Sequence, residues 1–237
     1  MKNQYFGDIN DYKKFGLLRS IMSSTDIKLL IAWMLTEDDG STDGKFIKYL
    51  QEPKKWKKFD PPLYDEIQNL LKNNGKRKVS LIEESAIMNN CKYHARLVPD
   101  QSEQRDTWFA SLISQSKKFD LVFLDPDNGL EVKSKPYGRK NSSKHLYWQE
   151  ISKLWAERKS LLIYQHFSRN KGETKEIFTN LKLGELSKKT KNSMVTSFTT
   201  SKVLFLLALQ PEHHKYKEPK VKKVQSNWAG QIDCSYN

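Results

Sequence analysis

Short apolar runs alternate along this chain with longer stretches in which apolar residues have helical spacing. The runs at residues 121–124 and 161–164 are apolar at every position, which is typical of strands buried on both faces of a parallel sheet. Helices between such strands cover the two faces, so the pattern predicts an α/β fold with a doubly wound, mainly parallel sheet. The predicted strands span residues 27–35, 78–82, 93–98, 119–124, 160–165 and 203–209. The predicted helices span residues 12–23, 62–73, 105–117, 145–158 and 174–183.

The end of the predicted sheet differs from its beginning. Residues 194–198 and 203–209 both have strand character, but only four residues separate them. A connection of this length cannot hold a crossover helix, so we expect the two strands to form an antiparallel hairpin. We expect one domain over residues 1–210, with a basic insertion at about residues 51–76. Residues 211–237 are predicted to be a basic, irregular tail, with Trp228 anchoring it to the domain.

Basic residues dominate the charge of the chain. The 237 residues include 41 Lys and Arg against 28 Asp and Glu, a net charge of +13. Cationic side chains that dock on phosphates release counterions, so the excess favours DNA or RNA as a partner. A solvated lysine-rich surface without a polyanionic partner is the alternative.

The cysteine spacing, the N-terminal residues and the length of the apolar runs together predict the cellular compartment. The two cysteines have neither zinc-site nor disulfide-framework spacing, and residues 1–8 show no apolar signal-peptide region. The apolar run at residues 203–209 is far shorter than the ~20 residues of a membrane span. We therefore expect a cytoplasmic protein with no membrane partner.

The segment that follows the predicted strand at residues 119–124 is the most informative for function. Asp125, Asp127 and Asn128 come directly after this apolar run, and Gly129 favours a tight turn. Pro126 has no backbone N–H to donate. Polar groups at the end of a buried strand are costly unless they face a cleft, so we expect this segment to form the floor of an active site. An ordinary turn between strand and loop is the alternative.

Two other predicted strands also end in polar residues. Thr36, Asp38, Asp39 and Gly40 follow the first strand, and Gln165 and His166 end the strand that begins at residue 160. Ligands of open α/β sheets bind outside the carboxyl ends of the strands, so these residues are expected to share one cleft. His166 is a candidate base, metal ligand or hydrogen-bonded edge residue.

A further Asp-Pro pair lies at Asp60 and Pro61 but has no apolar strand before it. We interpret Asp60 as the N-cap of the helix that follows, with the prolines in its first turn. This context separates it from the segment at Asp125.

The N-terminal stretch at residues 7–19, with Asp11 and Lys14, resembles the opening segment of the methyltransferases that modify adenine N6 in large-subunit ribosomal RNA. Parallel βα units that end in an antiparallel hairpin are also similar to the Rossmann-like sheet of class I S-adenosylmethionine-dependent methyltransferases. The resemblance implies S-adenosylmethionine as cofactor, with its methionine end held by residues 36–40 and its ribose by Glu83 after the second strand. It implies that Asp125 and the carbonyl of Pro126 accept hydrogen bonds from a target amine on a base turned out of its stack.

The chain departs from that family at two places. Asn128 and Gly129 stand where the family has a stacking aromatic residue, and Glu37, Asp38 and Asp39 replace its glycine-rich cofactor loop. These acids suggest a second class of function. Asp38, Asp39, Asp125, Asp127 and Glu131 are candidate oxygen ligands for Mg²⁺ in a nuclease or phosphotransferase.

Amine methylation on nucleic acid is our leading prediction, and a nucleic-acid-binding subunit without catalytic activity is a third possibility. The predicted catalytic residues are Asp125, Asp127, Asn128 and His166. The predicted substrate-binding residues are Lys14, Gln165 and Arg169.

Overall fold

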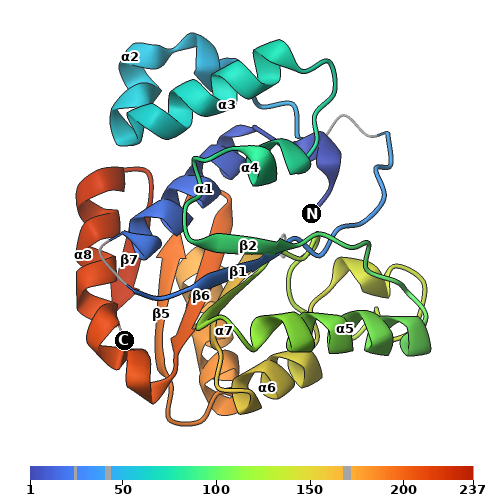
Figure 1. Ribbon diagram of the computed structural model, residues 1–237. Coiled ribbons are helices and arrows are strands. Elements are labelled where there is room, and N and C mark those ends of the chain that lie inside the picture. Colours follow the sequence, from blue (N-terminus) through green and yellow to red (C-terminus); the bar gives the residue numbers. More distant parts are fainter. Residues whose placement is uncertain (24–25, 41–43, 168–171, 237) are drawn as a thin grey trace.

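The computed structural model describes the chain except residues 24–25, 41–43, 168–171 and 237. The described residues form an α/β fold around a seven-stranded mixed sheet of order β2-β1-β3-β4-β6-β5-β7 (Figure 1). The strands are β1 (Leu29–Ala32), β2 (Cys91–His94), β3 (Leu121–Leu124), β4 (Ser160–His166), β5 (Met194–Thr199), β6 (Val203–Leu209) and β7 (Asp233–Tyr236). β1 to β4 run parallel, whereas β6, β5 and β7 each pair antiparallel with their neighbours. The sheet is compatible with a Rossmann-like fold, and the predicted hairpin is confirmed as β5 and β6.

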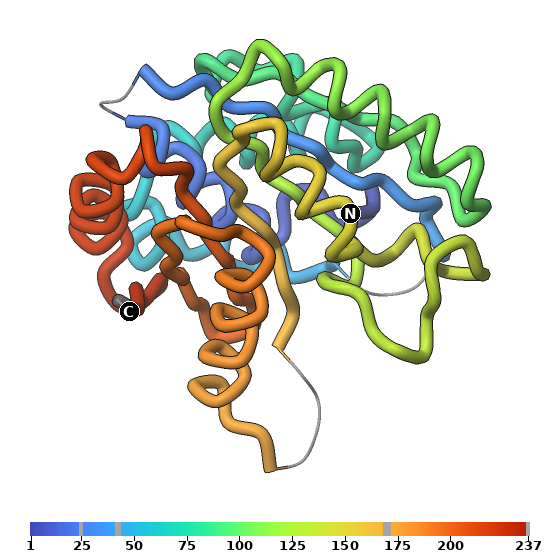
Figure 2. Tube along the Cα trace, turned by 90° about the horizontal axis from the view of Figure 1, so that it is seen from below, coloured from blue at the N-terminus to red at the C-terminus, as the bar shows by residue number. Residues whose placement is uncertain are grey.

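Helices cover both faces of the sheet. The α-helices are α1 (Ile9–Met22), α2 (Pro53–Trp56), α3 (Pro61–Asn73), α4 (Ser80–Glu84), α5 (Ser102–Ser116), α6 (Trp148–Ala156), α7 (Lys175–Lys189) and α8 (Lys217–Trp228). The 3-10 helices are η1 (Asn3–Tyr5), η2 (Lys48–Gln51), η3 (Lys57–Phe59), η4 (Ser142–Lys144) and η5 (Pro211–Tyr216). In both views α8 lies on the opposite side of the molecule from α5 (Figures 1 and 2).

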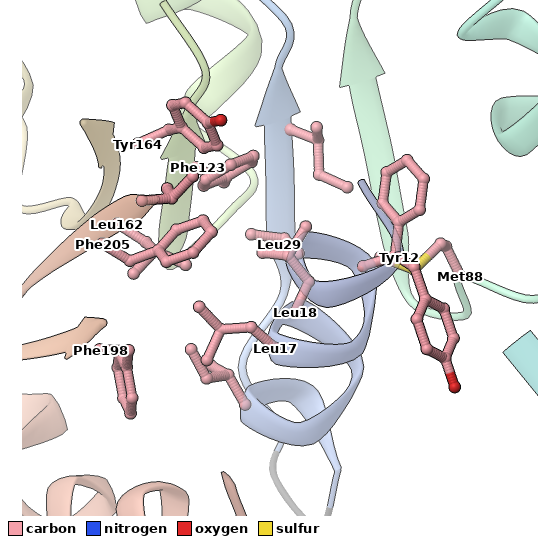
Figure 3. Close-up of a cluster of buried hydrophobic side chains, with 14 of the residues drawn as sticks. Tyr12, Leu17, Leu18, Leu29, Met88, Phe123, Leu162, Tyr164, Phe198 and Phe205 are labelled. Carbon is pink, nitrogen blue, oxygen red and sulfur yellow. The ribbon is translucent and has the colours of Figure 1, made fainter. Parts of the chain in front are cut away.

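The strand side chains alternate between two hydrophobic cores, as the period of two in a strand requires. In β3, Leu121 and Phe123 pack with α1, α3 and α8, whereas Val122 and Leu124 pack with α5, α6 and α7. Figure 3 shows the first core, in which Leu17 and Leu18 of α1 lie near the side chains of the sheet. β3 is buried on both faces and therefore has apolar residues at every position. This confirms the prediction that residues 121–124 form a strand buried on both faces of the sheet.

One predicted strand is wrong. Residues 78–82 do not join the sheet, and Ser80–Glu84 instead form the short helix α4. Val79 and Ile82 are buried and three positions apart, a spacing that places both on one side of a helical turn. Glu83 therefore lies within a helix and does not follow a strand. β1 lies between β2 and β3, and β2 overlaps the strand predicted at residues 93–98 only at its first two residues.

The segment after Gln210 is not irregular. It contains α8, which packs against α1, and β7, which pairs with β5. Trp228 of α8 is fully buried and stacks on Phe59 with ring centroids 5.5 Å apart, which confirms its predicted anchoring role. Gly16 in the middle of α1 permits this contact, since a Cβ there would lie 1.8 Å from the Trp228 ring.

Local capping follows the sequence. The Asp60 carboxylate accepts a hydrogen bond from the Leu63 N–H at 3.2 Å, and Pro61 begins α3. Asp60 is therefore a helix cap, as predicted. No helix in the described part of the chain is long and apolar enough to cross a membrane.

Candidate functional site

A cavity of about 720 Å³ lies at the carboxyl ends of β3 and β4. We call it the acidic cavity because four aspartates line it: Asp8, Asp11, Asp125 and Asp127. The remaining lining residues are Met1, Tyr5, Asn10, Lys14, Gly44, Phe46, Pro126, Asn128, Tyr164, His166, Phe167, Ser201, Lys202 and Val203. Separate parts of the sequence therefore meet at this edge of the sheet: the N-terminal segment, the loop residues Gly44 and Phe46, the end of β3, the end of β4 and the start of β6.

The turn after β3 is held by the end of β4. Gly129 has φ +89°, and a Cβ on it would lie 2.5 Å from the Gln165 Oε1. That oxygen accepts a hydrogen bond from the Leu130 N–H at 2.7 Å, and the Gln165 Nε2 donates to the His166 carbonyl. Gln165 is thus buried beneath the turn and supports it. It borders a neighbouring cavity of about 490 Å³ rather than the acidic cavity.

Asp125 is fixed by a buried lysine from α1. The Lys14 Nζ donates to Asp125 Oδ2 at 2.8 Å and lies 2.7 Å from Asp11 Oδ1, and all three side chains are almost fully buried. The rings of Trp33 and Tyr164 lie 5.3 Å and 5.6 Å from the same Nζ. Burial opposes the lysine charge, but the two carboxylates outweigh it and raise the pKa of Lys14. In the predicted substrate-binding role of Lys14, a substrate would therefore compete with two carboxylates for the ammonium.

The start of α1 contributes two of the four carboxylates, Asp8 and Asp11. Asp8 caps the helix and accepts hydrogen bonds from the N–H groups of Asn10 and Asp11 at 2.8 Å and 2.9 Å. Burial raises the pKa of Asp11 to about 7; Lys14 opposes this shift, and Asp8 adds to it. The acids thus repel one another unless a proton or a cation lies between them.

The crevice between the ends of β1 and β3 holds the N-terminal residue. The Met1 ammonium donates to the carbonyls of Met34 and Asp125 at 3.2 Å and 3.1 Å, and the Met1 carbonyl accepts from the Thr36 N–H at 2.9 Å. Figure 1 shows the N-terminus beside the end of β1. Two buried oxygens near this crevice, Thr36 Oγ1 and Asp127 Oδ1, have no hydrogen-bond partner.

The loop after β1 is tied to the N-terminal segment. The Lys2 Nζ lies 2.6 Å from Asp39 Oδ2 and 3.4 Å from Asp127 Oδ2, so it joins the loop to the end of β3. Asp38 accepts a hydrogen bond from the Gln4 N–H at 3.2 Å. Gly40 has φ +68° and is exposed.

The other predicted site residues lie in different places. Asn128 is exposed and borders both the acidic cavity and its neighbour. His166 lines the acidic cavity and is exposed there. The protein atoms packed around its ring partly desolvate it, which lowers its pKa, although the nearby carboxylates of Asp127 and Asp125 oppose that shift. Glu83 accepts a hydrogen bond from the Trp33 Nε1 at 2.6 Å. Arg169 lies outside the described residues.

The predicted metal ligands do not gather in one cavity, although Asp39 and Asp127 both contact Lys2. Asp125 and Asp127 lie in the acidic cavity, but Asp38 borders a separate pocket and Glu131 borders the cavity near Gln165. Within the described ranges, no group of three or more His, Cys, Asp or Glu side chains is arranged to hold a metal ion.

Sequence reasoning missed Asp8, Lys2 and Tyr164 as parts of the site. Asp8 carries a signal, since an aspartate directly before a helical run is a typical helix cap. Lys2 carries none, because its contact with Asp127 joins residues that are remote in the sequence.

The sequence matches no protein-family model, and no curated protein is similar to it at a significant level. The functional argument therefore depends on the geometry of the acidic cavity.

Proposed function

We propose that this chain is a class I methyltransferase-like enzyme that transfers a methyl group from S-adenosylmethionine to an amine of DNA or RNA. The observation that carries the proposal is the acidic cavity at the carboxyl ends of β3 and β4. Carboxylate oxygens accept hydrogen bonds from amines, and they favour a ligand that carries positive charge. The parallel strands followed by an antiparallel hairpin also support it.

The same carboxylates argue against phosphate chemistry at this place. The four aspartates of the cavity outnumber its cationic groups, which are the Met1 ammonium, Lys14 and Lys202. A phosphodiester there would therefore meet an excess of like charge unless a bound cation compensated it. The acids proposed as Mg²⁺ ligands are distributed over three cavities, and Asp125 already pairs with Lys14. A metal-dependent nuclease or phosphotransferase is therefore the weaker proposal.

The crevice between β1 and β3 offers suitable groups for the methionine end of the cofactor. The carbonyls of Met34 and Asp125 and the N–H of Thr36 already hold the backbone of a methionine residue, Met1. Thr36 Oγ1 and Asp127 Oδ1 are buried and have no hydrogen-bond partner. The donors and acceptors fit the cofactor, but Met1 must leave the crevice before it can bind.

When bound, S-adenosylmethionine supplies an electrophilic methyl group. The residues of the chain then bind and orient the amine. Asp125 and Asn128 accept its N–H hydrogen bonds, which directs the nitrogen lone pair away from them. Lys14 pairs with Asp125 and fixes its position, and His166, with its lowered pKa, is neutral at pH 7 and can accept a proton.

Calorimetric titration with S-adenosylmethionine, followed by transfer of a radiolabelled methyl group to RNA and DNA, tests this proposal. We expect the wild-type protein to bind the cofactor, and Asp127→Asn to lower kcat/KM by roughly 100-fold, as when one positioned hydrogen-bonding group is lost. Asp65→Asn is the matched control, because Asp65 is half-exposed on α3 and pairs with Lys57.

A wild-type protein that neither binds the cofactor nor methylates nucleic acid would refute the proposal. The titration and a nucleic-acid cleavage assay are repeated with Mg²⁺ and Mn²⁺. Cleavage that requires one of these ions would favour the nuclease instead.

A further inference from the structure

A second polar pocket lies next to the acidic cavity and has the opposite charge. It has a volume of about 440 Å³. We call it the cationic pocket; its lining residues are Asn3, Gln4, Asp38, Lys45, Gly75, Lys76, Arg77 and Lys78. Four cationic side chains thus face one carboxylate, so the pocket attracts anions.

Three of these cations are available to a ligand. Lys45, Lys76 and Lys78 are exposed, and none of them forms an ion pair with any described residue. Two lysines of the basic insertion differ from them, since Lys55 pairs with Glu52 and Lys57 pairs with Asp65. The net charge of the chain does not distinguish the pocket lysines from Lys55 and Lys57, but the presence or absence of ion-pair partners does.

Arg77 gives the pocket a fixed element. Its Nε donates to the Phe6 carbonyl at 2.6 Å, and its Nη2 donates to the Tyr5 carbonyl at 2.9 Å. These partners are neutral carbonyls, so they orient the guanidinium without pairing with its charge; the carboxylates of Asp11 and Asp8 in the acidic cavity also act on that charge. A planar guanidinium held in this way is suited to a phosphate group.

The two sites share a wall. In the N-terminal segment, Asn3 and Gln4 line the cationic pocket, whereas Tyr5 lines the acidic cavity. In the loop before η2, Lys45 lines the cationic pocket, and its neighbours Gly44 and Phe46 line the acidic cavity. A ligand with an amine at one end and a phosphate nearby would therefore find matching charge on both sides of this wall.

We propose that the cationic pocket binds a backbone phosphate of the nucleic-acid strand whose base amine enters the acidic cavity. This inference rests on the proposed function, because that function supplies the strand. Each ammonium that docks on a phosphate releases counterions, so binding through the pocket must weaken with salt.

The test compares two triple variants. Lys45→Ala/Lys76→Ala/Lys78→Ala removes the exposed cations of the pocket. The control is Lys188→Ala/Lys189→Ala/Lys191→Ala, which also removes three exposed lysines without described ion-pair partners. The control residues come directly before β5. The first residue of β5 pairs with the last residue of β6, whereas the cavity lies at the first residue of β6, so the control residues lie at the opposite end of the strands.

Binding of a fluorescein-labelled 12-nucleotide RNA, and of DNA with the same sequence, is measured by anisotropy at several salt concentrations. We expect the pocket variant to raise Kd about tenfold or more and to reduce the slope of log K against log salt by about 0.7, the value for one lost phosphate contact on a single strand. The control should change Kd less than about threefold. Adenosine monophosphate and inorganic phosphate are added as competitors. If the pocket binds RNA as part of a longer strand, neither competitor should displace the RNA at concentrations that would saturate a site for a single phosphate.

Equal losses in the two variants, no loss in the pocket variant, or a wild type that binds neither nucleic acid would overturn the inference. Displacement of RNA by the mononucleotide would replace the strand with a free nucleotide as the ligand. Cofactor titration of the same proteins separates the two proposals. If the wild-type protein does not bind S-adenosylmethionine but the pocket variant still loses RNA binding, only the proposal of methyl transfer is refuted. Equal methylation of RNA by both triple variants refutes the phosphate site alone.

Discussion

The acidic cavity and the cationic pocket lie on either side of the N-terminal segment but hold their charges differently. In the acidic cavity Lys14, Asp11 and Asp125 are buried and paired. In the cationic pocket Lys45, Lys76 and Lys78 are exposed and have no ion pair with described residues. Buried charges depend on one another for stability, whereas exposed ones remain available to a ligand. The contrast predicts different costs for removing a charge from each region.

Replacing Lys14 should have the largest effect. In Lys14→Met, the buried carboxylates of Asp11 and Asp125 lose their shared cation. We expect the free energy of unfolding to fall by about 3–5 kcal/mol, the usual cost of leaving a buried charge uncompensated. Urea denaturation measures this loss. Lys188→Met on the exposed end of α7 serves as the control and should change stability by less than about 0.5 kcal/mol. A similar small change in both variants would show that the buried charges are not coupled as described.

The pH dependence of stability should identify Asp11. Burial raises its pKa to about 7, so between about pH 4 and 7 the folded protein holds a proton that the unfolded chain has lost. Raising the pH through this window therefore favours the unfolded chain. As the pH rises through this window, the free energy of unfolding of the wild-type protein should fall relative to that of Asp11→Asn. The slopes of the two curves of free energy against pH should differ by at most about 1.4 kcal/mol per pH unit. Denaturation at several pH values measures both slopes, and parallel curves would contradict the raised pKa.

Asp39 should have a smaller effect, because it lies at the exposed end of the contact with Lys2. Its side chain is 43% exposed, whereas that of Asp127 on the other side of Lys2 is 2% exposed. We expect Asp39→Asn to lower the free energy of unfolding by no more than about 1 kcal/mol, the range for exposed ion pairs. Asp127→Asn provides the buried comparison in the same denaturation experiment. A loss in Asp39→Asn well above that limit would mean that the loop after β1 helps to hold the fold.

The lysines of the cationic pocket should matter least for stability. Lys45→Ala, Lys76→Ala and Lys78→Ala should each change the free energy of unfolding by less than about 0.5 kcal/mol, since no described ion pair is lost. Thermal denaturation of each single variant provides the measurement. A large loss in any of them would assign that lysine a structural role and weaken its use as a ligand contact.

Much of the fold was predictable because its signals are local. The buried run of β3, the hairpin of β5 and β6, and the cap at Asp60 are all encoded by residues close together in the sequence. Residues 78–82 were assigned wrongly for the same reason. A short apolar run fits either a strand or a helical turn, and only the burial of Val79 and Ile82 distinguishes them.

By itself, the sequence determined that polar residues follow β3 and end β4 and that these strands are buried, because strand periodicity and hydrophobicity act over a few residues. It also determined the basic charge of the chain. Only the tertiary structure decided which groups meet at the strand ends. Lys14 reaches Asp125 across 111 positions, and Met1 reaches the Asp125 carbonyl across 124. Such contacts arise when α1 packs onto the sheet, and no local pattern specifies the position at which a distant side chain arrives.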